Sequence, residues 1–306
     1  MAESHALSRK KLTKARVRGL VIALGSAVLW AAGYGYVAAQ QQQPQRRAAA
    51  APPAPTPGPW PVKLKDGQPD VQGIWQAAGP EGASGLTVEP LPNMMGGAAT
   101  APGIVVDPPD GRIPYLPWAR ARRDEVREHL LTLNRAQVDT RNRGWPDGVP
   151  RINYYSVNPF QITQPAGAVV ILYEAQHEFR YIPLDGRPQI DSGIKLWMGS
   201  SRGHWEGTTL VVDVMNIYDR VRFSVAGDFA SDDVKITERW KFVNADTIAH
   251  SATFVDPKVY TQPWTVAKTI RRVKDNGFEI MEYSGVEGEK DQDLMVDIPA
   301  NTPGKK

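Results

Sequence analysis

The stretch "GHWEGTTLVVDVMN" (203–216) predicts how the C-terminal half of this chain folds. Gly207 and Thr208 form a polar break before the apolar run "TLVVDVM", which is typical of a two-residue hairpin turn. Across that turn Trp205 pairs with Leu210, and the flanking residues pair in the same register. Because a turn this short joins only antiparallel neighbours, the stretch predicts an antiparallel sheet.

Runs that alternate between apolar and polar residues continue along the chain from about residue 150. Short polar turns, such as 244–246 and 275–277, separate several of these runs. A meander of this length has to protect its edges. We therefore expect an all-β antiparallel fold, closed as a barrel or folded as a sandwich, with one packed α-helix. The strand-like runs are 168–174, 177–184, 209–217, 233–243, 247–255, 264–273 and 278–286.

A single helix is predicted over "WARARRDEVREHLLTLNRAQVDT" (118–140). Val126, Leu130 and Leu133 follow the spacing i, i+4, i+7 that places apolar side chains on one helical face. Charged residues cover the other face, so we expect the helix to pack on the outside of the β-domain. His129 is then a surface residue.

The N-terminus has the pattern of a secretory signal peptide over residues 1–39. Basic residues precede the apolar run 19–39, which ends in the small residues Val37-Ala38-Ala39. The competing interpretation is an uncleaved anchor in the inner membrane, because about 20 apolar residues are enough to span a bilayer. Either interpretation places the rest of the chain in the periplasm or outside the cell.

Composition divides the remaining chain into four parts. Residues 40–59 are rich in Pro, Ala and Gln, which predicts a linker. Residues 60–150 are a Gly- and Pro-rich segment with the first strand and the helix, and 151–290 are the antiparallel β-domain. Residues 291–306 are predicted to be a disordered tail.

Charge and cysteine content exclude some classes of function. The net charge of +3 comes from basic residues beside the apolar run 19–39, so the pI gives no support for nucleic-acid binding. The chain has no cysteine, which excludes disulfides, thiolate metal sites and cysteine nucleophiles. We predict no metal and no cofactor, because the spacing of His177, His204 and His250 is not diagnostic of a three-histidine site.

The first predicted strand is "PDVQGIWQ" (69–76). Its Gly73-Ile74-Trp75 resembles the Gly-x-Trp signature of the first strand in lipocalins and other calycins. The resemblance implies a closed barrel with Trp75 buried at one end.

Five further stretches together resemble a family of exported bacterial β-rich proteins. Members commonly have Asp where this chain has Thr208, and His where it has Gln189. The resemblance implies an exported β-rich protein and names no reaction. The stretches are "GRIPYLPWA" (111–119), "GVPR" (148–151), "VVILYEAQHEFRYIPLDGRP" (169–188), "GHWEGTTLVVD" (203–213) and "VDPKVYTQPWT" (255–265).

The first candidate for chemistry is the polar face of the 203–216 hairpin. If His204 pairs with Val211 and Glu206 with Thr209, alternation places the two ionisable side chains on one face. An imidazole beside a carboxylate is suited to acid–base catalysis. The alternative is a solvated turn, since charged residues on strand faces are usually exposed.

The second candidate is "LYEAQHEFR" (172–180). A hairpin about Ala175 and Gln176 would place Glu174 directly across from His177, where a carboxylate raises the pKa of an imidazole and fixes its tautomer. The alternative is an ordinary cross-strand ion pair.

The third candidate joins the predicted strands 233–243 and 247–255. Alternation places Glu238 and His250 among bulky apolar residues on inward faces, where burial shifts pKa values. His250 could equally be a core histidine with its hydrogen bonds satisfied. The predicted substrate-binding residues are Arg180 (facing Ile171), Trp205, Glu238, His250, Tyr260 and Trp264.

Three functions remain open from the sequence. The first is an enzyme in which His204, Glu206, Glu174 and His177 converge on one cavity, as a lyase, isomerase or hydrolase acting on a hydrophobic or glycosidic compound. The second is a carrier that binds such a compound without turning it over. The third is an interaction module on a Pro/Ala-rich stalk.

Overall fold

The computed structural model describes residues 60–78, 87–92, 100–101, 103–129, 137–155 and 158–283. The predicted signal peptide or anchor, the linker 40–59 and the tail 291–306 lie outside these residues. Within them, no helix is both long enough and apolar enough to cross a membrane.

The described residues are mostly antiparallel strands. A short two-stranded sheet pairs β2 (Leu91–Pro92) with β3 (Thr100–Ala101), and β4 (Val105–Asp107) pairs with β12 of the main sheet. The main strands are β1 (Gly73–Ala77), β5 (Phe160–Thr163), β6 (Ala168–Tyr173), β7 (Phe179–Pro183), β8 (Ser200–Glu206), β9 (Thr209–Met215), β10 (Lys235–Asn244), β11 (Thr247–Val255) and β12 (Trp264–Arg272). The helical elements are α2 (Pro117–Glu128) and the 3-10 turns η2 (Thr140–Arg143) and η3 (Arg151–Tyr154).

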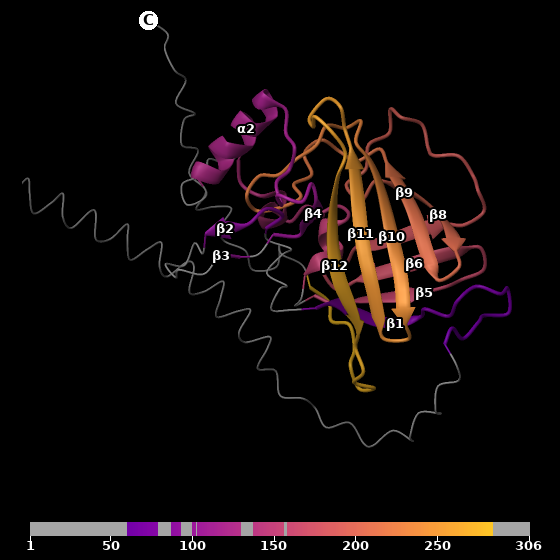
Figure 1. Cartoon of the computed structure of the whole chain (residues 1–306). Helices are drawn as coiled ribbons and strands as arrows, with labels where there is room; N and C mark the ends of the chain where they lie inside the picture. The colour runs from indigo at the N-terminus through magenta and orange to yellow at the C-terminus, as the bar shows by residue number, and fades with distance from the viewer. Residues whose placement is uncertain are drawn as a thin grey trace, which may run out of the picture. The chain divides into compact units, whose positions relative to one another are not determined.

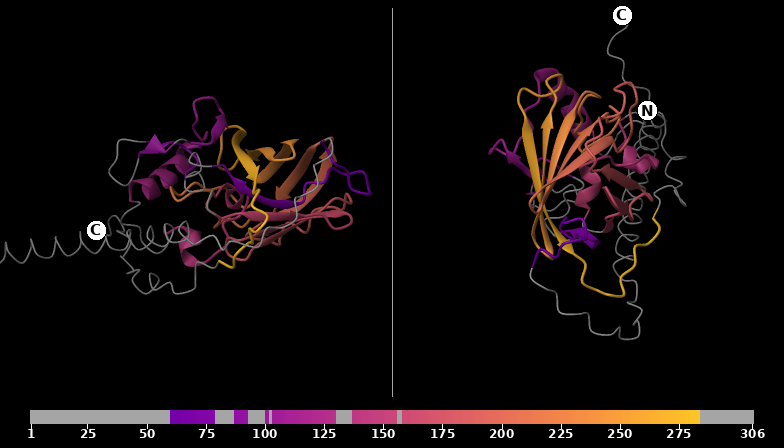
Figure 2. Two further views of the ribbon diagram at one scale, coloured as in Figure 1. Left: turned by 90° about the horizontal axis from the view of Figure 1, so that it is seen from below. Right: turned by 90° about the vertical axis from the view of Figure 1, so that its right-hand side faces the viewer.

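The main strands form a nearly closed barrel-shaped sheet. Its order is β7-β6-β5-β1-β12-β11-β10-β9-β8, so the strands β5 to β7 and the strands β8 to β12 each follow the order of the chain, and β1 joins β5 to β12. The long strands β10 to β12 stand in front of β5 and β6, which cross behind them at a steep angle (Figure 1), and Figure 2 shows the same crossing from two further sides. The prediction of an antiparallel barrel with one helix is confirmed.

The two ends of the sheet, β7 and β8, meet at what we call the seam. No ladder joins these strands in the described part of the chain, and they contact each other through side chains. Arg180 of β7 donates from Nε to Ser201 Oγ of β8 at 2.9 Å. A Cβ on Gly203 of β8 would lie 2.7 Å from Ile182 Cγ2 and 2.9 Å from Leu184 Cδ2, so glycine allows this close approach.

The hairpin at 203–216 forms in the predicted register. Trp205 pairs with Leu210, and the pairs Glu206–Thr209 and His204–Val211 lie on either side of it. The prediction of a strand at 278–286 is wrong for the described residues 278–283. They form no strand, and Tyr283 makes a single isolated β-bridge with Ala175. Strand β5 was not predicted: "FQIT" alternates apolar and polar residues, but over only four positions.

The Gly-x-Trp motif lies in β1, and its tryptophan is buried as predicted. Trp75 is fully buried, and its ring lies 4.2 Å from the Arg272 guanidinium of β12. Gly73 has a φ of 131°, and a Cβ there would meet Arg272 Nη1 at 2.2 Å. Glycine is therefore needed so that the arginine can cover the tryptophan.

Helix α2 ends at Glu128, earlier than the predicted 118–140; Leu130 and Leu133 lie outside the described residues. Val126 is buried and His129 is exposed, as expected. The charged face is not wholly in solvent, because Arg123 is buried and its Nη1 lies 2.7 Å from the buried Glu89 carboxylate. This ion pair fixes the helix to the β2 segment.

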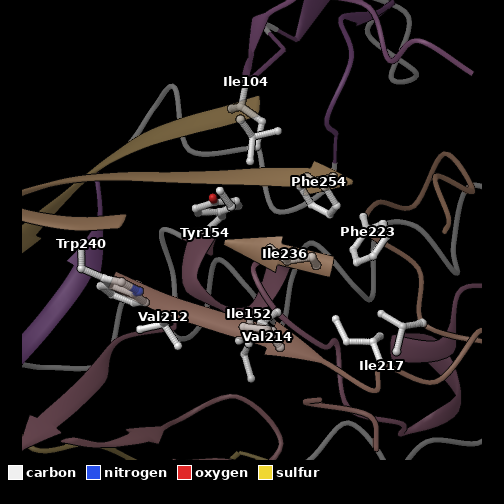
Figure 3. Close-up of a cluster of buried hydrophobic side chains, with 14 of the residues drawn as sticks. Ile104, Ile152, Tyr154, Val212, Val214, Ile217, Phe223, Ile236, Trp240 and Phe254 are labelled. Carbon is white, nitrogen blue, oxygen red and sulfur yellow. The ribbon is translucent and has the colours of Figure 1, made fainter. Parts of the chain in front are cut away.

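The core fills the interior of the barrel. Inward positions of β10 and β11 carry large side chains that pack with residues of β9 and η3 (Figure 3). The predicted division at residue 150 does not follow the sheet, since β1 and β4 pair with β12 of the C-terminal part. Among the fully buried side chains are Trp75, Trp240, Trp264, Phe160, Phe242 and Phe254.

Candidate functional site

The interior of the barrel contains a buried cluster of polar side chains, which we call the interior network. It consists of Asn153, Tyr154, Tyr173, Arg180, Ser201, Glu238 and His250. These residues come from η3, β6, β7, β8, β10 and β11, and all are at most 4% exposed. Three predicted substrate-binding residues therefore meet in one place.

Glu238 lies at the centre of the interior network. Alternation along β10 directs its side chain inward with Ile236 and Trp240, and it is 0% exposed. Its Oε1 accepts a hydrogen bond from Asn153 Nδ2 at 3.0 Å and lies 3.3 Å from His250 Nε2. Its Oε2 accepts a hydrogen bond from Arg180 Nη2. A buried carboxylate needs such donors, because desolvation without them is costly.

These contacts fix the state of Glu238. Burial alone would raise the pKa of Glu238, but the Arg180 guanidinium and the hydrogen bond from His250 lower it to about 2. The carboxylate is thus ionised at neutral pH. Because both of its oxygens already accept hydrogen bonds and its pKa is low, it orients other groups and is a poor proton acceptor itself.

His250 bridges Glu238 and Tyr154. Its Nδ1 lies 3.0 Å from the Tyr154 hydroxyl, while its Nε2 faces the Glu238 carboxylate. Because an ionised carboxylate only accepts, we assign a proton to His250 Nε2; in the tautomer that carries no second proton, Nδ1 accepts a hydrogen bond from the Tyr154 hydroxyl. Burial, with the Glu238 charge nearby, raises the pKa of Tyr154 well above its usual range, so the phenol keeps its proton. Tyr154, His250 and Glu238 are therefore linked one after another by hydrogen bonds, in the same order as the nucleophile, base and orienting carboxylate of a catalytic triad.

Arg180 brings an unused donor into the network. Its Nε donates to Ser201 and its Nη2 to Glu238, but Nη1 is buried and has no hydrogen-bond partner among the described residues. The Tyr173 hydroxyl, which lies beside the guanidinium, donates to Asn153 Oδ1 at 2.7 Å. A buried guanidinium N–H without an acceptor is costly, and an oxygen from a bound molecule would satisfy it.

His204 and Glu206 do not face the interior. Their side chains are 57% and 48% exposed and lie 3.3 Å apart on the outer face of β8, where Arg239 Nη2 also pairs with Glu206. The predicted pairing of an imidazole with a carboxylate is present. The expectation that they share a cavity with Glu174 and His177 is wrong, because strand alternation turns them to the solvent side of the sheet.

Glu174 and His177 do not pair across a two-residue turn. Tyr173 N donates to Glu178 O, so residues 174–177 form a longer loop. Buried Glu174 accepts a hydrogen bond from Met281 N at 3.0 Å, and His177 lies 3.7 Å from Glu282. Both side chains therefore contact the segment 281–282.

The other predicted binding residues divide between the interior and the core. Arg180 faces Ile171 across β6 and β7, as predicted. Trp205 is half-buried and donates to Gln68 Oε1 at 2.8 Å. Tyr260 and Trp264 are core residues: the Tyr260 hydroxyl donates to Phe229 O, and Trp264 stacks on Phe254 at 4.1 Å.

Asn153, Tyr154 and Ser201 are not among the candidate site residues that the sequence indicated. Asn153 and Tyr154 belong to η3, a turn whose residues are all buried. The only available signal was "RINYY", where an arginine and an asparagine stand within an apolar segment. Short 3-10 turns have no long periodicity that reveals which side chains point inward.

No group of three or more His, Asp or Glu suited to a metal ion occurs in the described ranges. A hollow of about 350 Å³ lies over Thr209, Arg239, Lys241, Ala249 and Ser251, beside the backbone of His250. The exposed side chains of Arg239 and Lys241 place it on the outer face of β9 to β11, away from the interior network. We base the candidate site on the interior network because an unpartnered guanidinium N–H lies there together with a histidine and an ionised carboxylate.

Comparisons with known proteins found no match for this chain. The chain matches no protein-family model, and neither the curated proteins nor the solved structures gave a match. The site therefore has to be interpreted from its own chemistry.

Proposed function

We propose that this protein is an exported enzyme that catalyses proton transfer on a small hydrophobic compound, as a lyase or isomerase does. The observation that supports the proposal is His250, held between the Tyr154 hydroxyl and the Glu238 carboxylate beside the unpartnered Arg180 Nη1. The aromatic rings around the network favour an apolar substrate; Phe160, for example, packs edge-on against Trp240 at 5.9 Å.

Each residue has a role that follows from its contacts. A substrate oxygen displaces the Tyr154 hydroxyl from His250 and accepts hydrogen bonds from Tyr154 and from Arg180 Nη1. His250 Nδ1, now free, takes a proton from the carbon beside that oxygen, and Glu238 stabilises the imidazolium. In an isomerase the same imidazolium returns the proton to a different carbon. Two donors and one base are what an enolate-forming reaction requires.

Access is proposed at the seam between β7 and β8. Arg180 and Ser201 meet there through a single side-chain hydrogen bond, whereas every other neighbouring pair of main strands is joined by a backbone ladder. Separating these two strands costs fewer hydrogen bonds than opening the sheet elsewhere.

The test is a turnover screen of the full-length protein against small ketones, hydroxy acids and unsaturated acids, followed by NMR. We expect His250→Gln and Tyr154→Phe to lower turnover by roughly 10²- to 10⁴-fold while the near-UV circular dichroism stays native. His204→Gln is the matched control, since that histidine is on the outer face. Equal losses in His204→Gln and His250→Gln, or full turnover in His250→Gln, would contradict the proposal.

A non-catalytic carrier is the second candidate. It is favoured because both oxygens of Glu238 already accept hydrogen bonds, and because Arg180 Nη1 could bind a ligand oxygen without any reaction. A carrier would be stabilised thermally by its ligand to the same extent in wild type and in His250→Gln, with no product formed. Arg180→Lys would weaken that stabilisation, because lysine cannot supply the three differently directed N–H groups.

A further inference from the structure

An aromatic cluster lies outside the interior network, at the loops beyond β7 and β9. Trp145 and Trp197 have ring centroids 4.8 Å apart with 34° between their planes, and Tyr218 meets Trp197 edge-on at 5.2 Å. We call Trp145, Trp197 and Tyr218 the aromatic cluster. They come from three loops that are far apart in sequence.

This cluster is open to solvent, unlike the tryptophans of the core. Trp145 is 42% exposed, whereas Trp75, Trp240 and Trp264 are 0% exposed. Leu196, next to Trp197, is 41% exposed. Trp197 and Tyr218 pack partly against the core and so give Trp145 a fixed base. Contiguous exposed apolar side chains of this kind are common at binding sites.

The backbone beneath the cluster is strained. Within the described ranges, the non-glycine residues with positive φ are Gln176 (60°), His177 (54°) and Asn216 (60°). Such conformations cost of order 1–3 kcal/mol each and gather at functional sites. Gln176 and Asn216 both hold a loop that carries a ring of the cluster.

Gln176 clamps the loop of Trp145. Its amide nitrogen donates to Trp145 O at 2.7 Å, and its amide oxygen accepts from Asp147 N at 3.2 Å. The amide nitrogen and the amide oxygen of Gln176 thus each hydrogen-bond a backbone group of the loop that carries Trp145. The strained φ of Gln176 directs its side chain towards that loop.

Asn216 holds the other two rings. Its Nδ2 donates to Ile190 O and Asp191 O at 3.2 and 2.9 Å, and its own carbonyl accepts from Leu196 N. Tyr218 N then donates to Leu196 O at 3.0 Å, which ties the Tyr218 loop to the Trp197 loop. The three rings are therefore held in advance of any binding event.

We propose that the aromatic cluster is a binding platform for the sugar rings of a neutral oligosaccharide. The C–H face of a pyranose is weakly positive and packs on the negative face of an indole, while its hydroxyl groups need polar partners at the rim. Asp219 and Arg220 follow Tyr218 and are both exposed, which supplies an acceptor and donors. This site is independent of the interior network and does not rest on its chemistry.

The positive charge of Arg220 beside the aromatic cluster favours a neutral ligand over a cationic one. The Arg220 guanidinium already lies 5.3 Å from the centroid of the Tyr218 ring, where it takes the position of a ligand ammonium and leaves the exposed Trp145 as the ring for a sugar to stack on. A purely apolar partner would leave the charged groups of Asp219 and Arg220 desolvated without partners. A ring with both C–H faces and hydroxyl groups satisfies both features.

The experiment is isothermal titration of the full-length protein with maltohexaose, cellohexaose and chitohexaose, and with tetramethylammonium as a cationic probe. We expect at least one hexasaccharide to bind, and Trp145→Ala to weaken it by about tenfold or more. Trp118→Ala is the matched control, because Trp118 is 52% exposed and packs against Phe229 elsewhere. Gln176→Ala removes the clamp and keeps the ring, and it should also weaken binding.

Three outcomes would overturn this proposal: no hexasaccharide binds, only tetramethylammonium binds, or Trp118→Ala weakens binding as much as Trp145→Ala does. A melting temperature for each variant excludes loss of the fold as the cause. His250→Gln should keep full oligosaccharide affinity, so failure of the interior chemistry and failure of the platform are separate results.

Discussion

At the scale of single residues, burial separates two pairs of charges that look alike in the sequence. Glu238 and Arg180 are hidden in the barrel, while Glu206 and Arg239 are each about half exposed. Buried ion pairs often add little net stability, because desolvation offsets the attraction. Removing one partner is costly, since the other charge is left buried alone.

Glu238→Gln should therefore lower the free energy of unfolding by about 3–5 kcal/mol at pH 7. The amide keeps the volume of the carboxylate but leaves the Arg180 charge without a counter-ion. Burial alone would raise the pKa of Glu238, but Arg180 and His250 lower it to about 2, below the ordinary value of 4.5. The stabilisation is then fully present above about pH 4.5 and is lost as the pH falls towards 2.

Urea unfolding of wild type and Glu238→Gln between pH 7 and pH 2 measures this effect. The difference between the two proteins should shrink below about pH 4.5. Glu206→Gln is the control, and its melting temperature should match that of wild type because the side chain is on the surface. A difference that stays constant down to pH 2 would mean that the pKa of Glu238 is not lowered.

At the scale of elements, the seam depends on Gly203. Its β8 backbone approaches Ile182 and Leu184 so closely that a methyl group has no room. Gly203→Ala should lower stability by about 1–3 kcal/mol through overpacking. The variant should also speed hydrogen exchange of amides in β7 and β8, because those strands are pushed apart.

Gly207→Ala provides the comparison within the same hairpin. Gly207 has a φ of 61° and no atom within 4 Å of an added Cβ, so the cost there is backbone strain of about 1–2 kcal/mol. Exchange in β7 should not change in that variant. Equal exchange in β7 for both alanine variants would show that the seam does not rest on Gly203.

At the scale of the whole molecule, closure of the barrel depends on β1. This strand pairs with β5 on one side and with β12 on the other, although it is far from both in sequence. Removing it would expose two sheet edges and the ring of Phe242, which packs against Trp75 at 5.7 Å.

We therefore expect a chain of residues 60–306 to be soluble and cooperatively folded, and a chain of residues 79–306 to aggregate or lose cooperative unfolding. The reason is that β1 supplies ladder hydrogen bonds to two strands and the buried Trp75. Size-exclusion chromatography and thermal melts of both chains measure the difference. Cooperative unfolding of residues 79–306 would show that the barrel closes without β1.

Local pattern in the sequence determined the strands and hairpins. Alternation predicted β9 to β12 and the inward positions of Glu238 and His250, because strand period and turn length are local properties. The burial of Trp75 agrees with the prediction made from Gly73 and Trp75. Strand β5 and turn η3 were missed, because neither is long enough to show a period.

Only the tertiary structure decided which polar residues meet. His204 and Glu206 are neighbours in a hairpin, but the pleat turns both to solvent. Asn153 and Glu238, 85 residues apart, share a hydrogen bond. The hydrogen bond between Asn153 and Glu238 depends on how the barrel closes. Closure is determined by long-range strand pairing and core packing, and no local sequence pattern specifies these. Sequence periodicity thus determined which side chains face inward, and the closed sheet determined which of them touch.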